Sequence, residues 1–139
     1  LRTFSKACGL AGARVGYAVG RPKIISNLLK IKSPFNVNVL SQQAAELILD
    51  HPELIEQRVE KIISERERIE KTFPEISYPS STNFILMDIN AKNYLMKEGI
   101  SVRGFNGRLE KFIRVTIGKK EENDKFIDLL KEYLNEKNK

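Results

Sequence analysis

Apolar residues recur at helical spacing through the second half of the chain. One series, at positions i, i+3, i+4, i+7 and i+8, comprises Phe126, Leu129, Leu130, Tyr133 and Leu134. A second comprises Ile55, Val59, Ile62, Ile63, Ile69 and Phe73. The first series predicts an amphipathic final helix, and the second predicts a long helix from about Glu53 to Lys71. Pro52 fits the opening turn of the long helix, because proline is tolerated only there.

Two shorter helices are predicted upstream. Pro22 suits the first turn of one helix, and Ile24, Ile25, Leu28 and Leu29 form its apolar side. This helix should end near Ser33, since Pro34 disfavours helical geometry in the preceding residue. The second helix begins around Ser41 and runs to Leu49.

Short apolar runs predict strands at 15–19, 82–89, 100–105 and 112–117. A short helix over 91–97 should be closed by Gly99 in the left-handed conformation, and Asn106-Gly107 is a strong turn signal. Strands alternating with helices indicate an α/β chain, whose C-terminal part is an α+β domain with a three-stranded sheet packed on helices. We place a domain boundary at the helix break, giving an N-terminal part over 1–52 and a C-terminal domain over 53–139.

Composition is typical of a globular protein, with 41% hydrophobic and 30% charged residues. The net charge of +6 raises the question of a nucleic-acid partner. Basic and acidic residues are interleaved, however, as in the run 65–68, which is typical of a solvated helix face. We therefore expect no nucleic-acid and no membrane partner. The single cysteine, Cys8, fits a reducing cytoplasm, and the single histidine gives no support to a metal site.

The most informative chemistry lies at the N-terminus. Lys6 follows the hydroxyl residues Thr3 and Ser5, and a small-residue stretch leads on to Arg14. A neutral lysine amine can bond covalently to an aldehyde, while hydroxyls and a guanidinium are good phosphate donors. Taken singly, each residue fits an ordinary glycine-rich turn. The ordered set instead provides the parts needed to hold a phosphorylated aldehyde.

This segment resembles the cofactor-lysine signature of fold-type-I aminotransferases, Ser-Lys-x-x-Gly-x-x-Gly-x-Arg-x-Gly-Tyr. The resemblance implies that the chain is the C-terminal portion of the fold-type-I transferase fold, with the edge of a large domain preceding a small domain. It also implies that Lys6 binds pyridoxal 5'-phosphate covalently and acts as the catalytic residue. Thr3, Ser5 and Arg14 would hold the cofactor phosphate.

Further segments resemble the histidinol-phosphate aminotransferase family: the run 33–42, which contains Pro-Phe-Asn-Val-Asn, and downstream 99–105, 113–118 and 121–123. The resemblance implies that Arg114 binds the anionic end of the substrate and that Arg103 assists with a phosphate. From the residues alone, a structural salt bridge is the favoured explanation of Arg114, because an unpaired charge between apolar strand residues is unfavourable. Lys119 departs from the family's usual threonine, so we expect a weaker cap on the final helix.

The family implies a small-molecule amino or phosphate substrate, histidinol phosphate with glutamate or 2-oxoglutarate, and a homodimer in the cytoplasm. The chain starts within the motif, so we expect a fragment of a longer protein that is inactive alone. The residues that bind the pyridine ring of the cofactor in this family would lie upstream. A related enzyme, such as an aromatic aminotransferase or threonine-phosphate decarboxylase, remains an alternative. A non-catalytic folded remnant or dimerisation module is another.

Overall fold

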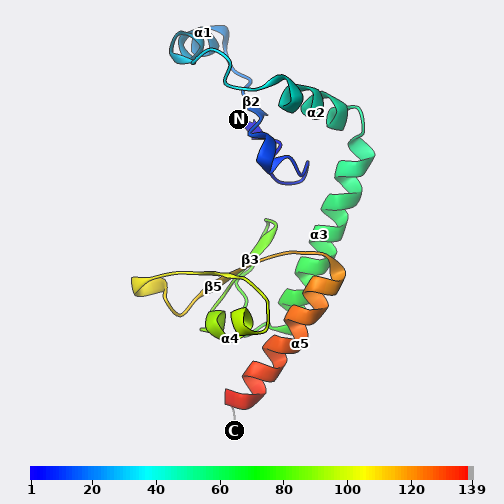
Figure 1. Ribbon diagram of the computed structural model, residues 1–139, viewed down its shortest axis with the longest axis vertical. Helices are drawn as coiled ribbons and strands as arrows, with labels where there is room; N and C mark the ends of the chain where they lie inside the picture. The colour runs from blue at the N-terminus through cyan, green and yellow to red at the C-terminus, as the bar shows by residue number, and fades with distance from the viewer. Residues whose placement is uncertain (138–139) are drawn as a thin grey trace. The chain divides into compact units, whose positions relative to one another are not determined.

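The computed structural model describes residues 1–137 (Figure 1). The chain divides into two compact units, Leu1–Val59 and Glu60–Lys139. The boundary lies inside helix α3 (Pro52–Thr72), whereas the sequence analysis placed a domain boundary at the start of this helix. Within residues 1–137, no helix is both long enough and apolar enough to cross a bilayer.

Unit 1 begins with a two-stranded antiparallel ribbon. Strand β1 (Arg2–Thr3) pairs with β2 (Gly16–Tyr17), and the 3-10 helix η1 (Ala11–Ala13) lies in the connecting segment. Of the strand expected over 15–19, only two residues form the ladder. Phe4 is buried and packs against the ring of Tyr17, with 5.9 Å between ring centroids. This small cluster fixes the segment in which Lys6 lies.

Two helices complete the N-terminal half of the chain. Helix α1 (Pro22–Ile31) starts at the predicted proline and ends two residues before Ser33. Helix α2 (Val39–Leu49) starts earlier than predicted, because the side chain of Asn38 caps it by accepting a hydrogen bond from the Ser41 amide at 2.9 Å. Residues 34–38 connect the two helices and belong to neither a helix nor a strand.

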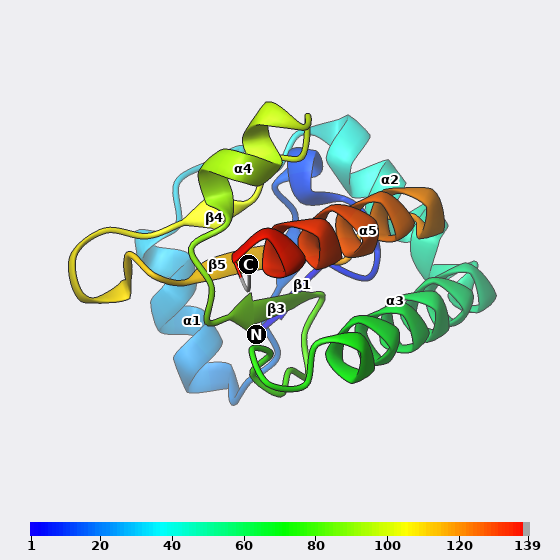
Figure 2. The same ribbon diagram turned by 90° about the horizontal axis from the view of Figure 1, so that it is seen from below.

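Unit 2 is built on a three-stranded antiparallel sheet, as the sequence predicted. The strands are β3 (Phe84–Met87), β4 (Arg103–Gly104) and β5 (Ile113–Thr116), and their order is β3-β5-β4. Helix α4 (Lys92–Lys97), the 3-10 helix η2 (Gly107–Leu109) and helix α5 (Lys120–Lys137) complete the unit. Figures 1 and 2 show α5 running beside the C-terminal half of α3. Gly99 has φ +81, the left-handed conformation predicted after α4.

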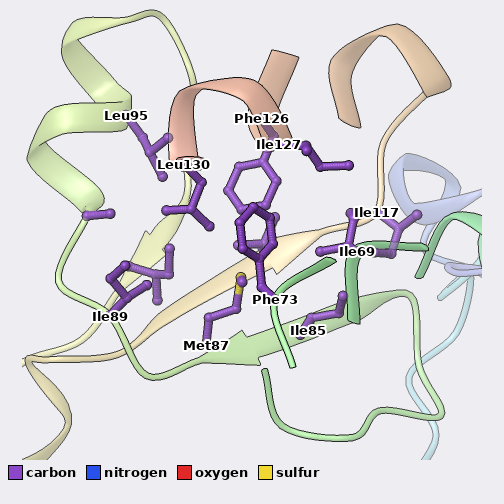
Figure 3. Close-up of a cluster of buried hydrophobic side chains, with 13 residues drawn as sticks. Ile69, Phe73, Ile85, Met87, Ile89, Leu95, Ile117, Phe126, Ile127 and Leu130 are labelled. Carbon is purple, nitrogen blue, oxygen red and sulfur yellow. The ribbon is translucent and has the colours of Figure 1, made fainter. Parts of the chain in front are cut away.

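One face of the sheet carries the core of unit 2 (Figure 3). Ile85 and Met87 from β3, with Ile113 and Val115 from β5, point into it. The helices contribute the remaining large apolar residues, which are Ile69, Phe73, Leu95, Phe126, Ile127 and Leu130. Alternate strand residues therefore face inward, and the residues between them, including Arg114, lie on the outer face.

The start of α5 is better capped than its sequence suggested. Although Lys119 replaces the expected threonine, the Glu122 carboxylate still accepts a hydrogen bond from the Lys119 amide at 2.7 Å. Buried Asn123 adds a second bond, accepting from the Gly118 amide at 2.9 Å. Its side-chain amide also donates to Glu65 on α3 at 2.7 Å. Asn123 thus joins α5 to both β5 and α3.

Candidate active site

Lys6 opens a tight turn at the end of the β1 segment. Its carbonyl accepts a hydrogen bond from the Gly9 amide at 2.8 Å, and Gly9 has φ +72. Glycine suits this position because side chains disfavour positive φ. The side chain of Lys6 is exposed, while Phe4, two residues earlier, is buried. The lysine therefore stands on an anchored loop with its amine accessible.

The hydroxyls of Thr3 and Ser5 lie together beside Lys6. Thr3 donates a hydrogen bond to the Ser5 hydroxyl at 2.9 Å, and the Ser5 amide donates to the Thr3 hydroxyl at 3.1 Å. Alternate residues of an extended segment project to the same side. The two hydroxyls consequently form one small polar group on one side of the chain.

Arg14 reaches the same neighbourhood through strand pairing. Thr3 pairs with Gly16, and the Phe4 amide donates to the carbonyl of Val15 at 3.3 Å. Arg14 lies one residue before Val15 and two before Gly16, so it lies just before the strand that pairs with Thr3. Arg14 itself is exposed, has φ 52, and donates one hydrogen bond from Nη1 to the Ala11 carbonyl at 3.1 Å. Its remaining N–H groups are suited to an anion.

These residues fit the phosphate group of a phosphorylated aldehyde. The paired hydroxyls of Thr3 and Ser5, together with the guanidinium of Arg14, offer several donors on an exposed surface. A Cβ added at Gly12 would meet no atom within 4 Å, so open space adjoins the intervening loop. A nucleophilic amine next to phosphate donors is the set of groups that pyridoxal phosphate requires.

A second cationic group lies on the outer face of the unit 2 sheet. Arg103 of β4 and Arg114 of β5 are directly opposite partners in the antiparallel register, and both side chains are exposed. In the sequence Arg114 lies between Ile113 and Val115, but those two side chains face the core while that of Arg114 faces away from it. Its charge is therefore not buried among apolar residues. No ion pair found among residues 1–137 includes Arg114, which disfavours the structural salt bridge considered above.

Phe84 supports Arg114 in a way that sequence reasoning missed. The Arg114 guanidinium lies over the Phe84 ring, 4.9 Å from its centroid. Phe84 is on β3, two residues before Leu86, the register partner of Arg114 on that strand. A guanidinium over an aromatic face is attracted to the ring electrons. The sequence shows that Phe84 is an aromatic residue at the start of a strand. It does not show that Arg114 is its partner, which becomes clear only from the pairing of β3 with β5.

This sheet and this lysine motif define a class of protein. The sequence pattern of the aminotransferase class I and II family matches residues 1–130, and the chain belongs to that family. Among curated relatives, histidinol-phosphate aminotransferase of Pyrococcus furiosus is 53% identical over 136 residues, covering 98% of this chain. The enzyme of the same name from Thermococcus kodakarensis is 47% identical, covering 96% of this chain. The chain spans about 40% of the length of these relatives.

Solved structures agree with this assignment. Histidinol-phosphate aminotransferase from Sinorhizobium meliloti, solved in complex with pyridoxal-5'-phosphate, matches with a TM-score of 0.84 and 30% identity, over 96% of this chain and 40% of that chain. L-threonine-O-3-phosphate decarboxylase from Porphyromonas gingivalis matches with a TM-score of 0.74 and 27% identity, over 96% of this chain and 45% of that chain. The fold predicted from the sequence, part of the fold-type-I transferase fold, is confirmed.

Proposed function

We propose that the complete protein containing this chain is a pyridoxal-phosphate-dependent aminotransferase, with Lys6 as the residue that bonds covalently to the cofactor. The observation that carries the proposal is the pair of hydrogen-bonded hydroxyls, Thr3 and Ser5, immediately before the exposed Lys6. When bound, pyridoxal phosphate supplies a ring that stabilises negative charge developing on the substrate α-carbon.

The residues of this chain have separate tasks in the proposed reaction. Thr3, Ser5 and Arg14 hold the phosphate of the cofactor and so fix its orientation. The amine of Lys6 would provide the nucleophile that bonds to the aldehyde of the cofactor. Once displaced by the amino group of the substrate, Nζ of Lys6 would accept the proton that leaves the substrate α-carbon and would pass it to the former aldehyde carbon of the cofactor. In the second half-reaction it would move a proton in the opposite direction.

Arg103 and Arg114 would bind the anionic end of the substrate. Two adjacent guanidinium groups suit a phosphate dianion better than a single carboxylate, which supports histidinol phosphate as one substrate. Glutamate, with 2-oxoglutarate as its keto form, would use Arg114 in the other half-reaction, whereas Arg103 would assist only with the phosphate. Transamination between these substrates, as the names of the curated relatives suggest, belongs to histidine biosynthesis.

The covalent step can be tested by borohydride trapping. The complete protein is incubated with pyridoxal phosphate, reduced and digested, and the modified peptide is identified by mass spectrometry. We expect the adduct on Lys6 and no adduct in a Lys6→Ala variant. Modification of another lysine would exclude the assignment.

The likeness to threonine-phosphate decarboxylase makes a decarboxylase the second candidate. The substrate of such a decarboxylase also carries a phosphate, so the arginine pair alone does not distinguish a decarboxylase from an aminotransferase. An aromatic aminotransferase is a third possibility within the family. Turnover of histidinol phosphate, threonine phosphate and phenylalanine by the complete protein distinguishes them, and we expect histidinol phosphate to be preferred.

The 139-residue chain by itself should have little or no activity. Unit 1 exposes large apolar side chains that a complete protein would cover, including Leu29, Ile31, Phe35 and Leu40. We propose that the rest of the protein and a second copy cover them, giving a homodimer in the cytoplasm. A monomeric mass for the complete protein in solution would contradict the dimer. If the complete protein binds no pyridoxal phosphate, a non-catalytic module is the better interpretation.

A further inference from the structure

A long-range contact holds the turn that follows Lys6. Arg58 of α3 donates a hydrogen bond from Nη1 to the carbonyl of Ala7 at 2.9 Å. Ala7 lies inside the turn that the carbonyl of Lys6 and the amide of Gly9 close at 2.8 Å. The guanidinium therefore reaches across 51 sequence positions to the residue next to the lysine.

Gly9 also takes part in this contact, because its lack of a side chain leaves room for Arg58. A Cβ built on Gly9 would collide with Nη1 of Arg58, in addition to being strained at φ +72. The guanidinium thus occupies the space that a side chain at Gly9 would need. The hydrogen bond and this close approach together place the Arg58 guanidinium against the turn.

The surroundings of the contact offer an independent probe. Cys8, between Ala7 and Gly9, lines a hollow of about 360 Å³ together with Arg58 and apolar residues of α2. Cys8 is partly buried there. Any loosening of the turn changes the access of reagents to this thiol, whether or not a cofactor is bound.

We propose that Arg58 is a positioning residue for Lys6: its bond to the Ala7 carbonyl holds the 6–9 turn and thereby the lysine amine in place. The inference rests on the proposed role of Lys6 in cofactor binding. In this proposal Arg58 acts on Lys6 through the turn and does not itself bind the cofactor.

The first measurement needs no cofactor. In the apo form of the complete protein, the alkylation rate of Cys8 is followed by peptide mass spectrometry. Arg58→Ala should raise the rate about twofold to tenfold, the change expected when one exposed hydrogen bond is lost, and Arg58→Lys should restore part of the protection. The matched control is Arg66→Ala, which removes another α3 arginine that donates to a carbonyl, that of Thr82 at 3.1 Å. A wild-type rate in Arg58→Ala, or an equal rise in Arg66→Ala, overturns the inference.

The second measurement is a double-mutant cycle on the affinity for pyridoxal phosphate. Arg58→Ala should weaken binding about twofold to tenfold when Lys6 is present and leave it unchanged in a Lys6→Ala background. Equal effects in both backgrounds, or none in either, would overturn a role that operates through Lys6. The proposed function fails separately, if Lys6→Ala binds the cofactor as tightly as the parent. The Cys8 measurement remains decisive for the turn in that case.

Discussion

Arg103 and Arg114 stand directly opposite each other on neighbouring antiparallel strands, with both side chains exposed. Like charges in this position repel and destabilise the sheet. An arrangement that is unfavourable for the empty protein becomes favourable when an anion lies between the two guanidinium groups. The pair therefore supports a site for a multiply charged ligand.

Replacing Arg103 with glutamine should separate ligand binding from stability. Without ligand, the change should stabilise the protein by about 0.2–1 kcal/mol, since it removes the repulsion across the strands. With inorganic phosphate added, the parent should gain more stability than the variant. The apparent unfolding midpoint, measured with and without phosphate, checks both expectations. Arg108→Gln, in η2, is the control because Arg108 has no partner across a strand.

Arg114→Gln should impair both half-reactions of the proposed enzyme. We expect KM for histidinol phosphate and for glutamate to rise about tenfold to a hundredfold, the effect of losing a hydrogen bond between charged groups. Arg103→Gln should raise KM for histidinol phosphate more than KM for glutamate. Steady-state kinetics on the complete protein tests this difference, and equal effects of Arg103→Gln on the two substrates would contradict the assigned roles.

Phe84→Leu should weaken anion binding without removing a charge. The ring stabilises the guanidinium of Arg114 by about 0.5–1 kcal/mol at an exposed site. Substrate KM should accordingly rise about twofold to fivefold. Phe84→Tyr keeps an aromatic face and should behave like the parent. If leucine and tyrosine variants have the same KM, the ring does not support Arg114.

Asn123→Ala should destabilise unit 2 by about 1–3 kcal/mol, because Gly118 and Glu65 lose hydrogen-bond partners in a buried setting. The apparent midpoint of urea unfolding measures this change. Asn135→Ala, on the exposed side of the same helix, is the control and should leave the midpoint nearly unchanged. A similar loss in both variants would mean that helix propensity, and not the cap, is responsible.

Acid should weaken the contact between α3 and α5. The hydrogen bond from Arg68 lowers the pKa of Glu65, and the hydrogen bond from Lys120 lowers the pKa of Asp124. A carboxylate whose pKa is lower in the folded state contributes stability above its unfolded pKa, and this contribution is lost as the pH falls through the folded value. We therefore expect stability to decline below about pH 4. Glu65→Gln should flatten this decline in unfolding measurements between pH 7 and pH 3, and an unchanged profile would contradict the assignment.

Periodicity predicted the elements that carry the core. The spacing from Phe126 to Leu134 identified α5, and the alternation of Ile113, Arg114 and Val115 is the pattern of a strand with one buried face. Gly99 adopts the predicted left-handed conformation, which glycine commonly adopts directly after the end of a helix. These signals are local and depend on neighbouring residues alone.

Contacts between residues that are far apart in the sequence could not be predicted from these local patterns. The strand predicted over 100–105 is reduced to Arg103–Gly104, since only these residues find ladder partners on β5. The hydrogen bond from Arg58 to Ala7 and the stacking of Arg114 on Phe84 depend on how separate elements pack. The capping role of Asn123 was missed for the same reason, because its partner Glu65 lies on another helix.

The strand order gives the two arginines unequal freedom. β5, which bears Arg114, is bonded on both sides, whereas β4 is a two-residue strand at the sheet margin. Amide exchange at Arg114 should accordingly require opening of the whole sheet, while Arg103 can exchange through local fraying. The backbone that bears Arg114 is thus held more firmly than the backbone that bears Arg103. In the proposed substrate site, this difference would let the arginine pair accept anionic groups of different size while Arg114 stays in place.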